Sequence, residues 1–371
     1  MKRMLTLTLL VLASSPLVAA EDYIPKSGEF PPANVGHYFA GELVEVDHVN
    51  RRGAIRLVGD TDDSRYHGAP SHKFAMLPYG TIRYHGAPAE LRDIPIGTML
   101  HGFFVLPPLG ETPLPKPTGD ARYLVKYTHA ISLEDDFSFY QRQGQAWKVA
   151  SIDPKGKLKV TSTGKAAAHG LTGEQSFTID ESTRIWKGRQ IGTLKDLAAG
   201  QEVQVNLTWA PDWKNGEVHA QDIWLDQESR DVAAEVQRQI HIRFQKSRWL
   251  AGWVDKVEHV EGTKGIVTLT LFGGMDPTLY AAVKKGGWNK LAAGEPTLRT
   301  YWQDHDSKGG QILEVKKLDK PLPGSSGIQV RIQMNELLEG YRPGRIVRLM
   351  GDGFQNAKLP QEERIKNVQE R

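Results

Sequence analysis

A pattern of strands and turns recurs three times along this chain of 371 residues. In each copy a hairpin is followed by a strand, a turn, a short link that ends in glycine, and further strands. The link is LRDIPIG at 91–97, LKDLAAG at 194–200 and LEGYRPG at 338–344. Self-similarity of this kind predicts a tandem array of one supersecondary unit. We therefore expect three related modules, the third being the most divergent because an insertion stretches it.

The strands of the pattern are short and half-buried. In QEVQVNLTW the apolar residues Val203, Val205 and Leu207 alternate with polar ones, so one face is buried and the other is wet. Many short strands with regular turn signals favour a small barrel or sandwich. We predict a mainly all-β fold of tandem small β-barrels. The expected modules span 40–140, 145–228 and 250–355, between an N-terminal segment at 21–39 and a polar tail at 356–371.

The middle module resembles the OB-like domains of unknown function found in secreted bacterial proteins. The resemblance rests on a Thr-x-Ile-x-x-Gly turn at 183–188, on the Leu-x-x-Leu-x-x-Gly link at 194–200, and on the strand with Val203 and Val205. It is best over 145–226, fair over 40–135 and loose over 250–353. Because these are turn and core positions, the resemblance implies a fold and brings no catalytic residues with it.

One long helix is predicted at 229–249, between the second and third modules. Ser229 is the expected N-cap, and basic residues gather at the other end, as the helix dipole favours. Apolar residues recur three or four positions apart, namely Ala233, Val236, Ile240 and Phe244. This spacing predicts an apolar stripe that packs on a barrel.

The first residues read as a secretory signal peptide. Lys2 and Arg3 precede a short apolar run and then small residues up to Ala20. The run is shorter than the roughly 20 residues that a membrane-spanning helix needs. We expect cleavage near Ala20 and export to the periplasm or beyond, with no membrane-spanning segment in the mature protein.

The amino-acid composition excludes several kinds of site and makes some partners less suitable. The chain has no cysteine, which excludes a disulfide framework, a thiolate zinc site and a cysteine nucleophile. Loss of Lys2 and Arg3 with the signal takes the 47 basic and 44 acidic side chains to 45 and 44. Such a balance offers no long-range field for nucleic acid. We expect an envelope polysaccharide or another envelope protein as partner; the oligomeric state stays open.

Sequence signatures of the common enzyme classes are missing from the chain. It has no nucleophile elbow, P-loop, dinucleotide fingerprint or helical His-Glu-x-x-His. A carboxylate pair for glycoside cleavage needs a structural frame to be recognised, so that chemistry stays open. Our leading hypothesis is a non-catalytic binding or scaffolding protein of the bacterial envelope, with no cofactor.

The hexapeptide RYHGAP occurs twice, at 65–70 and 83–88. When modules one and two are overlaid, His85 falls on Lys187, which favours a turn over a metal site for the second copy. The alternative hypothesis is a metal-binding protein or a metal-dependent hydrolase. Imidazoles and carboxylates there suit a divalent transition metal. Its candidate ligands are His67, His72, His85, His101, Asp62 and Asp63.

Two tryptophans are candidates for a ligand-stacking surface. Trp213 lies in a turn, and Trp224 is expected to point outward because Ile223 and Leu225 point inward. Exposed indole rings on such a barrel stack on sugars or bases. The competing interpretation is that the helix or a domain contact covers them. Arg243 and Lys246, near the end of the helix, are further candidates for binding an anionic ligand.

Overall fold

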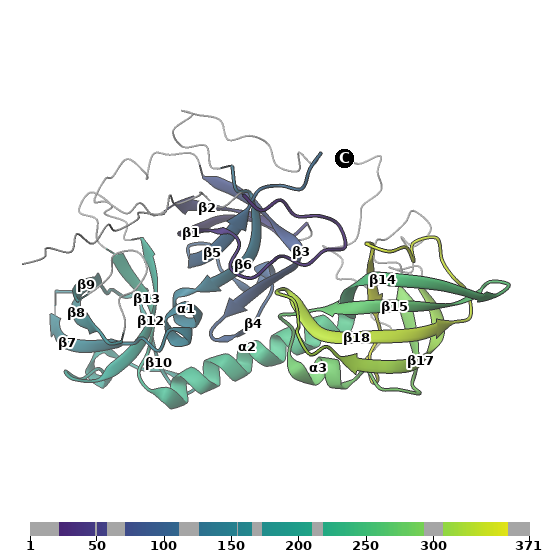
Figure 1. The fold of residues 1–371 in the computed structure, drawn as a ribbon. Coiled ribbons are helices and arrows are strands. Elements are labelled where there is room, and N and C mark those ends of the chain that lie inside the picture. The colour runs from purple at the N-terminus through teal and green to yellow at the C-terminus, as the bar shows by residue number, and fades with distance from the viewer. Residues whose placement is uncertain are drawn as a thin grey trace, which may run out of the picture.

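The computed structural model describes residues 22–48, 50–57, 71–110, 126–153, 155–164, 173–209, 218–292 and 307–354. Its sheets close into three small β-barrels that follow one another along the chain. The prediction of a mainly all-β, tandem-barrel fold is confirmed. Barrel 1 lies between barrels 2 and 3, and helix α2 (Gln227–Arg248) runs from barrel 2 past barrel 1 to the near side of barrel 3 (Figure 1).

Barrel 1 closes in the order β2-β1-β5-β6-β3, with β2 pairing back onto β3. Its elements are β1 (His37–Asp47), β2 (Arg52–Leu57), β3 (His72–Tyr84), β4 (Ala87–Pro88), η2 (Leu91–Asp93), β5 (Met99–Val105) and β6 (His129–Asp135). All neighbouring strands of the ring are antiparallel except β3 and β6. The core is filled by inward-facing residues such as Leu43, Ile55 and Phe104.

Barrel 2 repeats this order as β13-β12-β7-β8-β9, closed by a parallel pairing of β9 with β13. Its elements are β7 (Trp147–Asp153), β8 (Lys157–Ser162), β9 (Glu174–Thr178), β10 (Arg184–Lys187), β11 (Gln190–Ile191), η5 (Leu194–Asp196), β12 (Glu202–Trp209) and β13 (Val218–Trp224). Five strands with one parallel closure are compatible with OB-like barrels.

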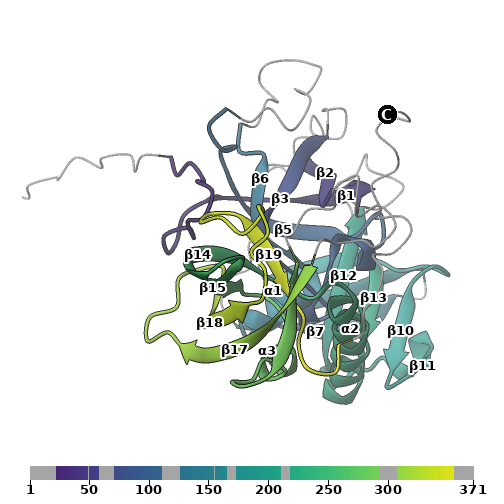
Figure 2. The same cartoon turned by 90° about the vertical axis from the view of Figure 1, so that its right-hand side faces the viewer.

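Barrel 3 closes differently, in the order β14-β15-β18-β17-β16-β19. Its elements are β14 (Leu250–Glu261), β15 (Lys264–Phe272), α3 (Pro277–Ala281), β16 (Trp288–Ala292), β17 (Ser307–Lys317), β18 (Ser325–Met334) and β19 (Ile346–Leu349). All six pairings of this ring are antiparallel. The third module therefore keeps a closed barrel but has its own strand order (Figure 2).

The recurring glycine of the link has a conformational reason. Gly97, Gly200 and Gly344 have φ of 94°, 85° and 80°. A side chain at such φ is strained, whereas glycine adopts it freely. In barrels 1 and 2 a single 3₁₀ turn precedes this glycine and a barrel strand follows it. The repeated sequence therefore encodes the same tight turn before a strand in both barrels.

Barrels 1 and 2 are joined through the short helix α1 (Asp136–Arg142), which follows β6 directly. The Asp135 carboxylate caps its N-terminus by accepting from the Ser138 N–H at 3.0 Å. On the other side, Phe139 and Tyr140 are buried in the core of barrel 2. The Tyr140 ring meets the Trp147 ring edge-on at 5.7 Å. The connection is thus part of a core rather than a loose linker.

Helix α2 begins earlier than predicted and packs on its other face. Its N-cap is Asp226, whose carboxylate accepts from Ser229 N at 2.7 Å, so Ser229 lies inside the helix. Of the predicted apolar stripe, Val236 and Ile240 face solvent, at 42% and 38% exposed, whereas Ala233 and Phe244 are half-buried. The buried residues of α2 are polar, namely Ser229, Gln237, His241 and Gln245.

Hydrogen-bonding groups on the barrels explain why α2 buries its polar side. Ser229 Oγ accepts from the Gly188 N–H of barrel 2 at 2.8 Å. Gln237 Nε2 donates to the Pro88 carbonyl at 3.3 Å and to Asp93 at 3.1 Å, both in barrel 1. Because their hydrogen bonds are satisfied, these side chains are buried at little cost.

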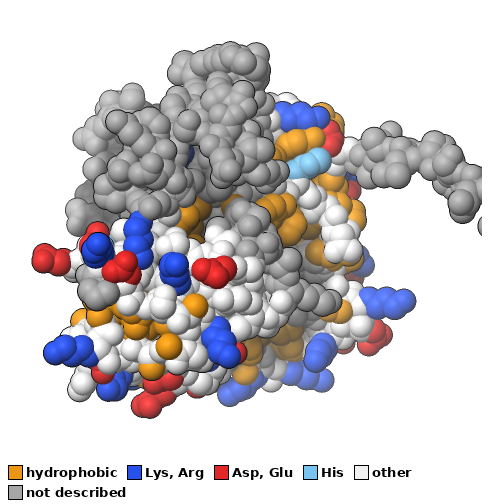
Figure 3. Space-filling view, turned by 90° about the vertical axis from the view of Figure 1, so that its left-hand side faces the viewer, with side chains coloured by type: hydrophobic (Ala, Val, Ile, Leu, Met, Phe, Trp, Pro, Cys, Tyr) orange, Lys and Arg blue, Asp and Glu red, His pale blue; other side chains and the backbone are white. Residues whose placement is uncertain are grey.

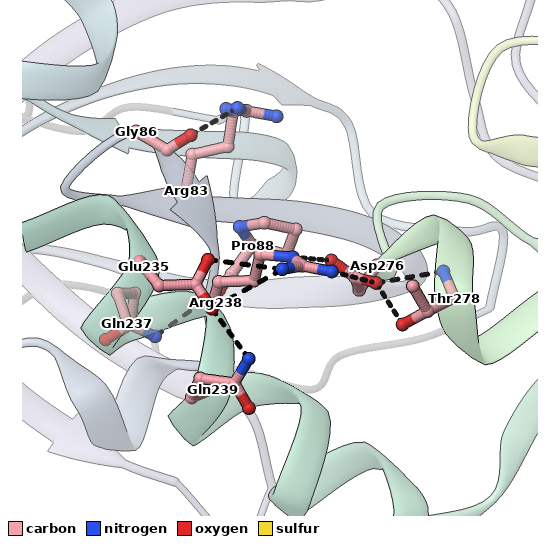
Figure 4. Close-up of polar contacts among 9 residues, drawn as sticks. All are labelled: Arg83, Gly86, Pro88, Glu235, Gln237, Arg238, Gln239, Asp276 and Thr278. Atoms are coloured by element: carbon pink, nitrogen blue, oxygen red, sulfur yellow. Dashed lines mark hydrogen bonds and ion pairs between the residues drawn. The ribbon is translucent and has the colours of Figure 1, made fainter. Parts of the chain in front are cut away.

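Ion pairs and an apolar cluster hold barrel 3 against α2 and barrel 1. Arg238 of α2 reaches between Glu235 and Asp276, and its Nε lies 2.5 Å from Asp276 Oδ2 (Figure 4). Asp276 also caps α3, so the helix is fastened to the N-terminus of the next helix. In addition, Tyr79 of barrel 1 packs with Trp253 and other apolar residues of barrel 3. Barrel 3 is thus joined to both α2 and barrel 1.

Candidate functional site

The second RYHGAP copy is a turn, as predicted. β3 ends at Tyr84, and His85 and Gly86 follow with left-handed φ of 51° and 78°. The His85 N–H donates to Asp135 at 3.1 Å, and the Gly86 N–H donates to Ser138 at 2.8 Å. The motif therefore connects barrel 1 to α1. The first copy lies outside the described residues.

The predicted metal ligands that can be placed are structural side chains. His72 lies in barrel 1 between the rings of Phe39 and Phe104. His101 is 2% exposed and stacks on Phe139 with ring centroids 3.9 Å apart. Its Nε2 is 2.6 Å from Asp136 Oδ1. These contacts occupy His101 in the joint between barrels 1 and 2.

No metal-binding group of three or more His, Asp or Glu side chains occurs within the described part of the chain. His72, His85 and His101 are thus not brought together there with carboxylates as a ligand set. His67, Asp62 and Asp63 lie outside the described residues.

Trp224 does not point outward, and this prediction was wrong. Its side chain is 1% exposed and meets the Phe137 ring edge-on at 4.7 Å. The ring of His85 lies 4.9 Å away. A domain contact covers the indole, because α1 and barrel 1 close over the end of β13. Trp213 lies outside the described residues.

Arg243 and Lys246 are exposed on α2, away from its buried polar face. Charges of both signs are interspersed over the described surface at the barrel 2 end of the molecule, with apolar side chains between them (Figure 3). This mixture agrees with the nearly balanced composition. The described residues on this side form no extended cationic face for a polyanion.

A buried polar network fills the joint between barrels 1 and 2. Asn206 of β12 accepts from the Phe137 N–H at 2.7 Å and donates to Asp135 at 2.9 Å. Asp136 accepts from the Leu207 N–H at 2.8 Å. Burial raises the pKa of Asp135, and donated hydrogen bonds oppose that rise. The network specifies how the two barrels dock, because each group would be costly to leave unpaired.

A cavity of about 50 Å³ lies where barrel 1, α2 and barrel 3 meet. Its ionisable lining comes from all three parts, namely Arg51 and Glu90 from barrel 1, His241 and Arg248 from α2, and Arg348 from β19. Glycine makes the close approach of the barrels possible at its wall. A Cβ on Gly274 would lie 2.5 Å from Thr81 Cγ2.

Arg51 and Glu90 form the barrel 1 wall of this junction cavity. Arg51 sits in the turn between β1 and β2 with φ of 51°, an uncommon conformation for a residue with a side chain. Its terminal nitrogens donate to three carbonyls within 77–80 of β3 at 2.9 to 3.2 Å. Its Nε lies 3.2 Å from Glu90, and Gln245 of α2 donates to the other Glu90 oxygen at 2.7 Å.

Among the described residues of the lining, there are three arginines and one carboxylate. Burial opposes ionisation of Glu90, but the neighbouring basic groups, Arg51 and Arg248 foremost, together outweigh it, and the Glu90 pKa lies below its ordinary value. Burial, and then the nearby Arg248, lowers the pKa of Arg348 to about 9. A guanidinium stays protonated at neutral pH, so this lowering expresses the cost of burying the Arg348 charge next to another arginine.

His241 is a buried polar side chain without a hydrogen-bond partner among the described residues. It is 2% exposed, and neither ring nitrogen is bonded. Burial lowers its pKa, while Glu90, Asp93 and Asp276 oppose that effect. A neutral imidazole facing a cavity offers one donor and one acceptor.

Sequence reasoning missed this cavity. Arg51, His241 and Arg348 are separated by 190 and 107 positions and belong to no shared motif. The spacing of Gln237, His241 and Gln245 by four residues was visible, but it reads as an exposed polar face. Only the docking of α2 between two barrels turns that face inward.

The fold defines a class of protein, a tandem array of small closed β-barrels whose first two members are compatible with OB-like modules. Profiles of known protein families, curated proteins and solved structures were all compared with the chain, and none matches it. Across the described residues, no helix has the length and apolar character needed to cross a membrane.

Proposed function

We propose that this protein is an exported, non-catalytic binding or scaffolding component of the bacterial envelope, akin to the secreted OB-like proteins that its middle module resembles. We infer export because the N-terminus resembles a signal peptide. We infer binding because small barrels of this class commonly bind ligands. A periplasmic or released location, and a polysaccharide or protein partner, belong to the same proposal.

The observation that carries it is the way the barrels are joined. A buried polar network docks barrel 2 on barrel 1, and α2 is hydrogen-bonded to both. An ion pair with Asp276, whose side chain is 3% exposed, then ties α2 to barrel 3. Joints of this kind hold the three barrels in a set geometry, which is what a scaffold requires. The buried His101, Asp135 and Asp136 serve the joint.

Native mass spectrometry of the mature protein, extracted from the envelope of its own cells, tests the proposal. We expect a chain cleaved near Ala20 that carries a bound protein or glycan mass. An uncleaved chain in the cytoplasm would contradict export, and a bare mass after gentle extraction would contradict binding. One transition-metal mass that is lost in acid would favour the metal alternative.

Substitutions of two arginines on α2 test whether partner binding depends on the fixed arrangement of the three barrels. Arg238→Met breaks the tie to Asp276, whereas Arg243→Met removes a similar side chain from the exposed face. We expect only Arg238→Met to increase the radius of gyration in solution scattering and to reduce partner retention. Equal retention in both variants would contradict a scaffold with fixed joints.

A further inference from the structure

We propose that the outer face of barrel 3 carries a stacking site for a neutral polysaccharide, centred on Trp288 of β16. A sugar ring stacks on the indole, and the amides of Gln311 and Gln333 on the two neighbouring strands bind hydroxyl groups of the chain. This inference deepens the proposed binding role and rests on it, because it names the class of partner and the place where that partner binds.

Trp288 is an exposed tryptophan on a strand whose alternate residues face the core. Its side chain is 59% exposed, whereas Asn289 is 4% exposed and Leu291 is 0% exposed. Every other tryptophan whose side chain the structure describes is buried or half-buried. Because the indole points away from the barrel core, most of its ring surface is available to a ligand.

A glycine on the next strand lets the indole lie against the sheet. Gly309 of β17 lies opposite Lys290, two positions beyond Trp288 along β16. A Cβ at Gly309 would lie 2.9 to 3.1 Å from three indole atoms of Trp288, namely Cζ2, Nε1 and Cε2. Since glycine has no side chain, the indole lies across the β17 backbone. A ring that is already held in place loses little conformational entropy when a ligand stacks on it.

Amide side chains continue this face across the sheet. Gln311 lies directly opposite Trp288, and Gln333 of the adjoining strand β18 lies directly opposite Gln311 (Figure 1). Both amides point outward, because the residues on either side of each are buried. Strands are spaced by about 4.8 Å, so the row from Trp288 to Gln333 covers about 10 Å. A ring stacked on the indole thus leaves the adjoining ring of the same chain beside the amides.

The charge of this face favours a neutral polysaccharide over a nucleic acid. Trp288, Gln311 and Gln333 carry no charge, and β16 adds only the charge of the half-buried Lys290. Nucleic acid binding needs several cations that follow the phosphate backbone. A hexose ring instead has a face of C–H groups, which packs on an indole, and a rim of hydroxyls, which pair with amide donors and acceptors.

The same face is a poor match for a protein partner. A stable protein interface buries about 1,000 Å² or more around an apolar centre. On this face a single apolar ring is followed along the row by two amides. That pattern suits a narrow polar chain with apolar ring faces.

Calorimetric titration of the full mature chain with short oligosaccharides tests the site. The neutral probes are oligosaccharides of glucose and of N-acetylglucosamine, and the anionic probe is an oligosaccharide of galacturonic acid. We expect saturable binding of a neutral probe and weaker binding of the anionic one.

Three variants locate the site. Trp288→Ala should weaken binding of the neutral probe about tenfold or more, because it removes the stacking surface. Gly309→Ala keeps the indole but displaces it from the sheet, and should also weaken binding. Val260→Ala is the matched control, since it removes another exposed apolar side chain of barrel 3, and it should leave the affinity unchanged. The side chains of Trp288 and Val260 are both exposed, so neither of these two variants disturbs the core.

The assignment is overturned if neither neutral probe binds the parent protein, or if Trp288→Ala and Val260→Ala bind the neutral probe equally well. Preferential binding of the galacturonic acid probe would contradict it as well. A protein mass that native mass spectrometry detects on the parent but not on Trp288→Ala would assign the face to a protein partner instead.

Failure of this site and failure of the proposed function give different results. A bound envelope protein together with failed titrations would keep the proposed function and remove the stacking site. An uncleaved chain in the cytoplasm that still binds the neutral probe through Trp288 would keep the site and contradict export.

Discussion

The buried imidazole of His72 should make barrel 1 sensitive to mild acid. His72 is 2% exposed and packs between two phenylalanine rings at centroid distances of 5.8 and 5.5 Å. Burial lowers its pKa from 6.5 to about 4. Replacement by phenylalanine keeps a planar ring in this place and removes the titrating group.

The direction in which stability changes with pH depends on whether the folded or the unfolded chain binds a proton on His72. Between pH 6.5 and 4 the unfolded chain holds a proton on His72 that the folded barrel does not, so stability is full above this window and is lost as the pH falls through it. Linkage with these two pKa values gives a loss of about 2 kcal/mol between pH 7 and pH 5. His72→Phe should lack this part of the pH dependence, whatever its stability at pH 7.

Hydrogen exchange followed by mass spectrometry on peptides of β3 measures this locally. Opening free energies report barrel 1 alone, which matters because a chain of three barrels is not expected to unfold in one step. The quantity to compare is the change in opening free energy from pH 7 to pH 5, corrected for intrinsic exchange rates. His129, also buried and with a pKa lowered to about 4, provides a second variant, His129→Phe.

The reasoning would be refuted if the parent and His72→Phe lost the same opening free energy between pH 7 and pH 5. That outcome would mean that His72 gains no proton on unfolding. A uniform drop at both pH values would report only altered packing and would leave the slope as the deciding measurement.

Three substitutions test the packing of barrels 1 and 2 through the opening free energies of their strands, measured by the same hydrogen-exchange experiment. Trp224→Ala should cost about 3 to 5 kcal/mol, since it empties the contact with Phe137; a change under about 1 kcal/mol would contradict its burial. Asn206→Leu leaves the Phe137 N–H without its acceptor and should lower the opening free energy by about 1 to 3 kcal/mol. Undiminished stability would show that water replaces the amide. Gly102→Ala should cost about 1 to 3 kcal/mol because its Cβ would overlap the Phe104 ring, and a neutral effect would contradict the tight core.

The sequence by itself determined the all-β character and the number of modules. Alternation along strands and recurrence of the glycine link are local signals, and each has a local cause in the two-residue period of a strand and in the positive φ of Gly97, Gly200 and Gly344. The turn at His85 was predictable for the same reason, because module two carries its own glycine turn at the equivalent place.

Only the tertiary structure decided what the joints bury. Trp224 was assigned to the exposed face because Ile223 and Leu225 point inward, but α1 and barrel 1 cover that face too, so all three are buried. The packing face of α2 was misassigned because periodicity detects apolar residues and takes polar ones to be exposed. Here barrel 1 offers carboxylates and carbonyls to the helix, so Gln237 and Gln245 are buried while Val236 faces solvent. The junction cavity depends on three segments far apart in the chain, and no spacing within any of them encodes its charge.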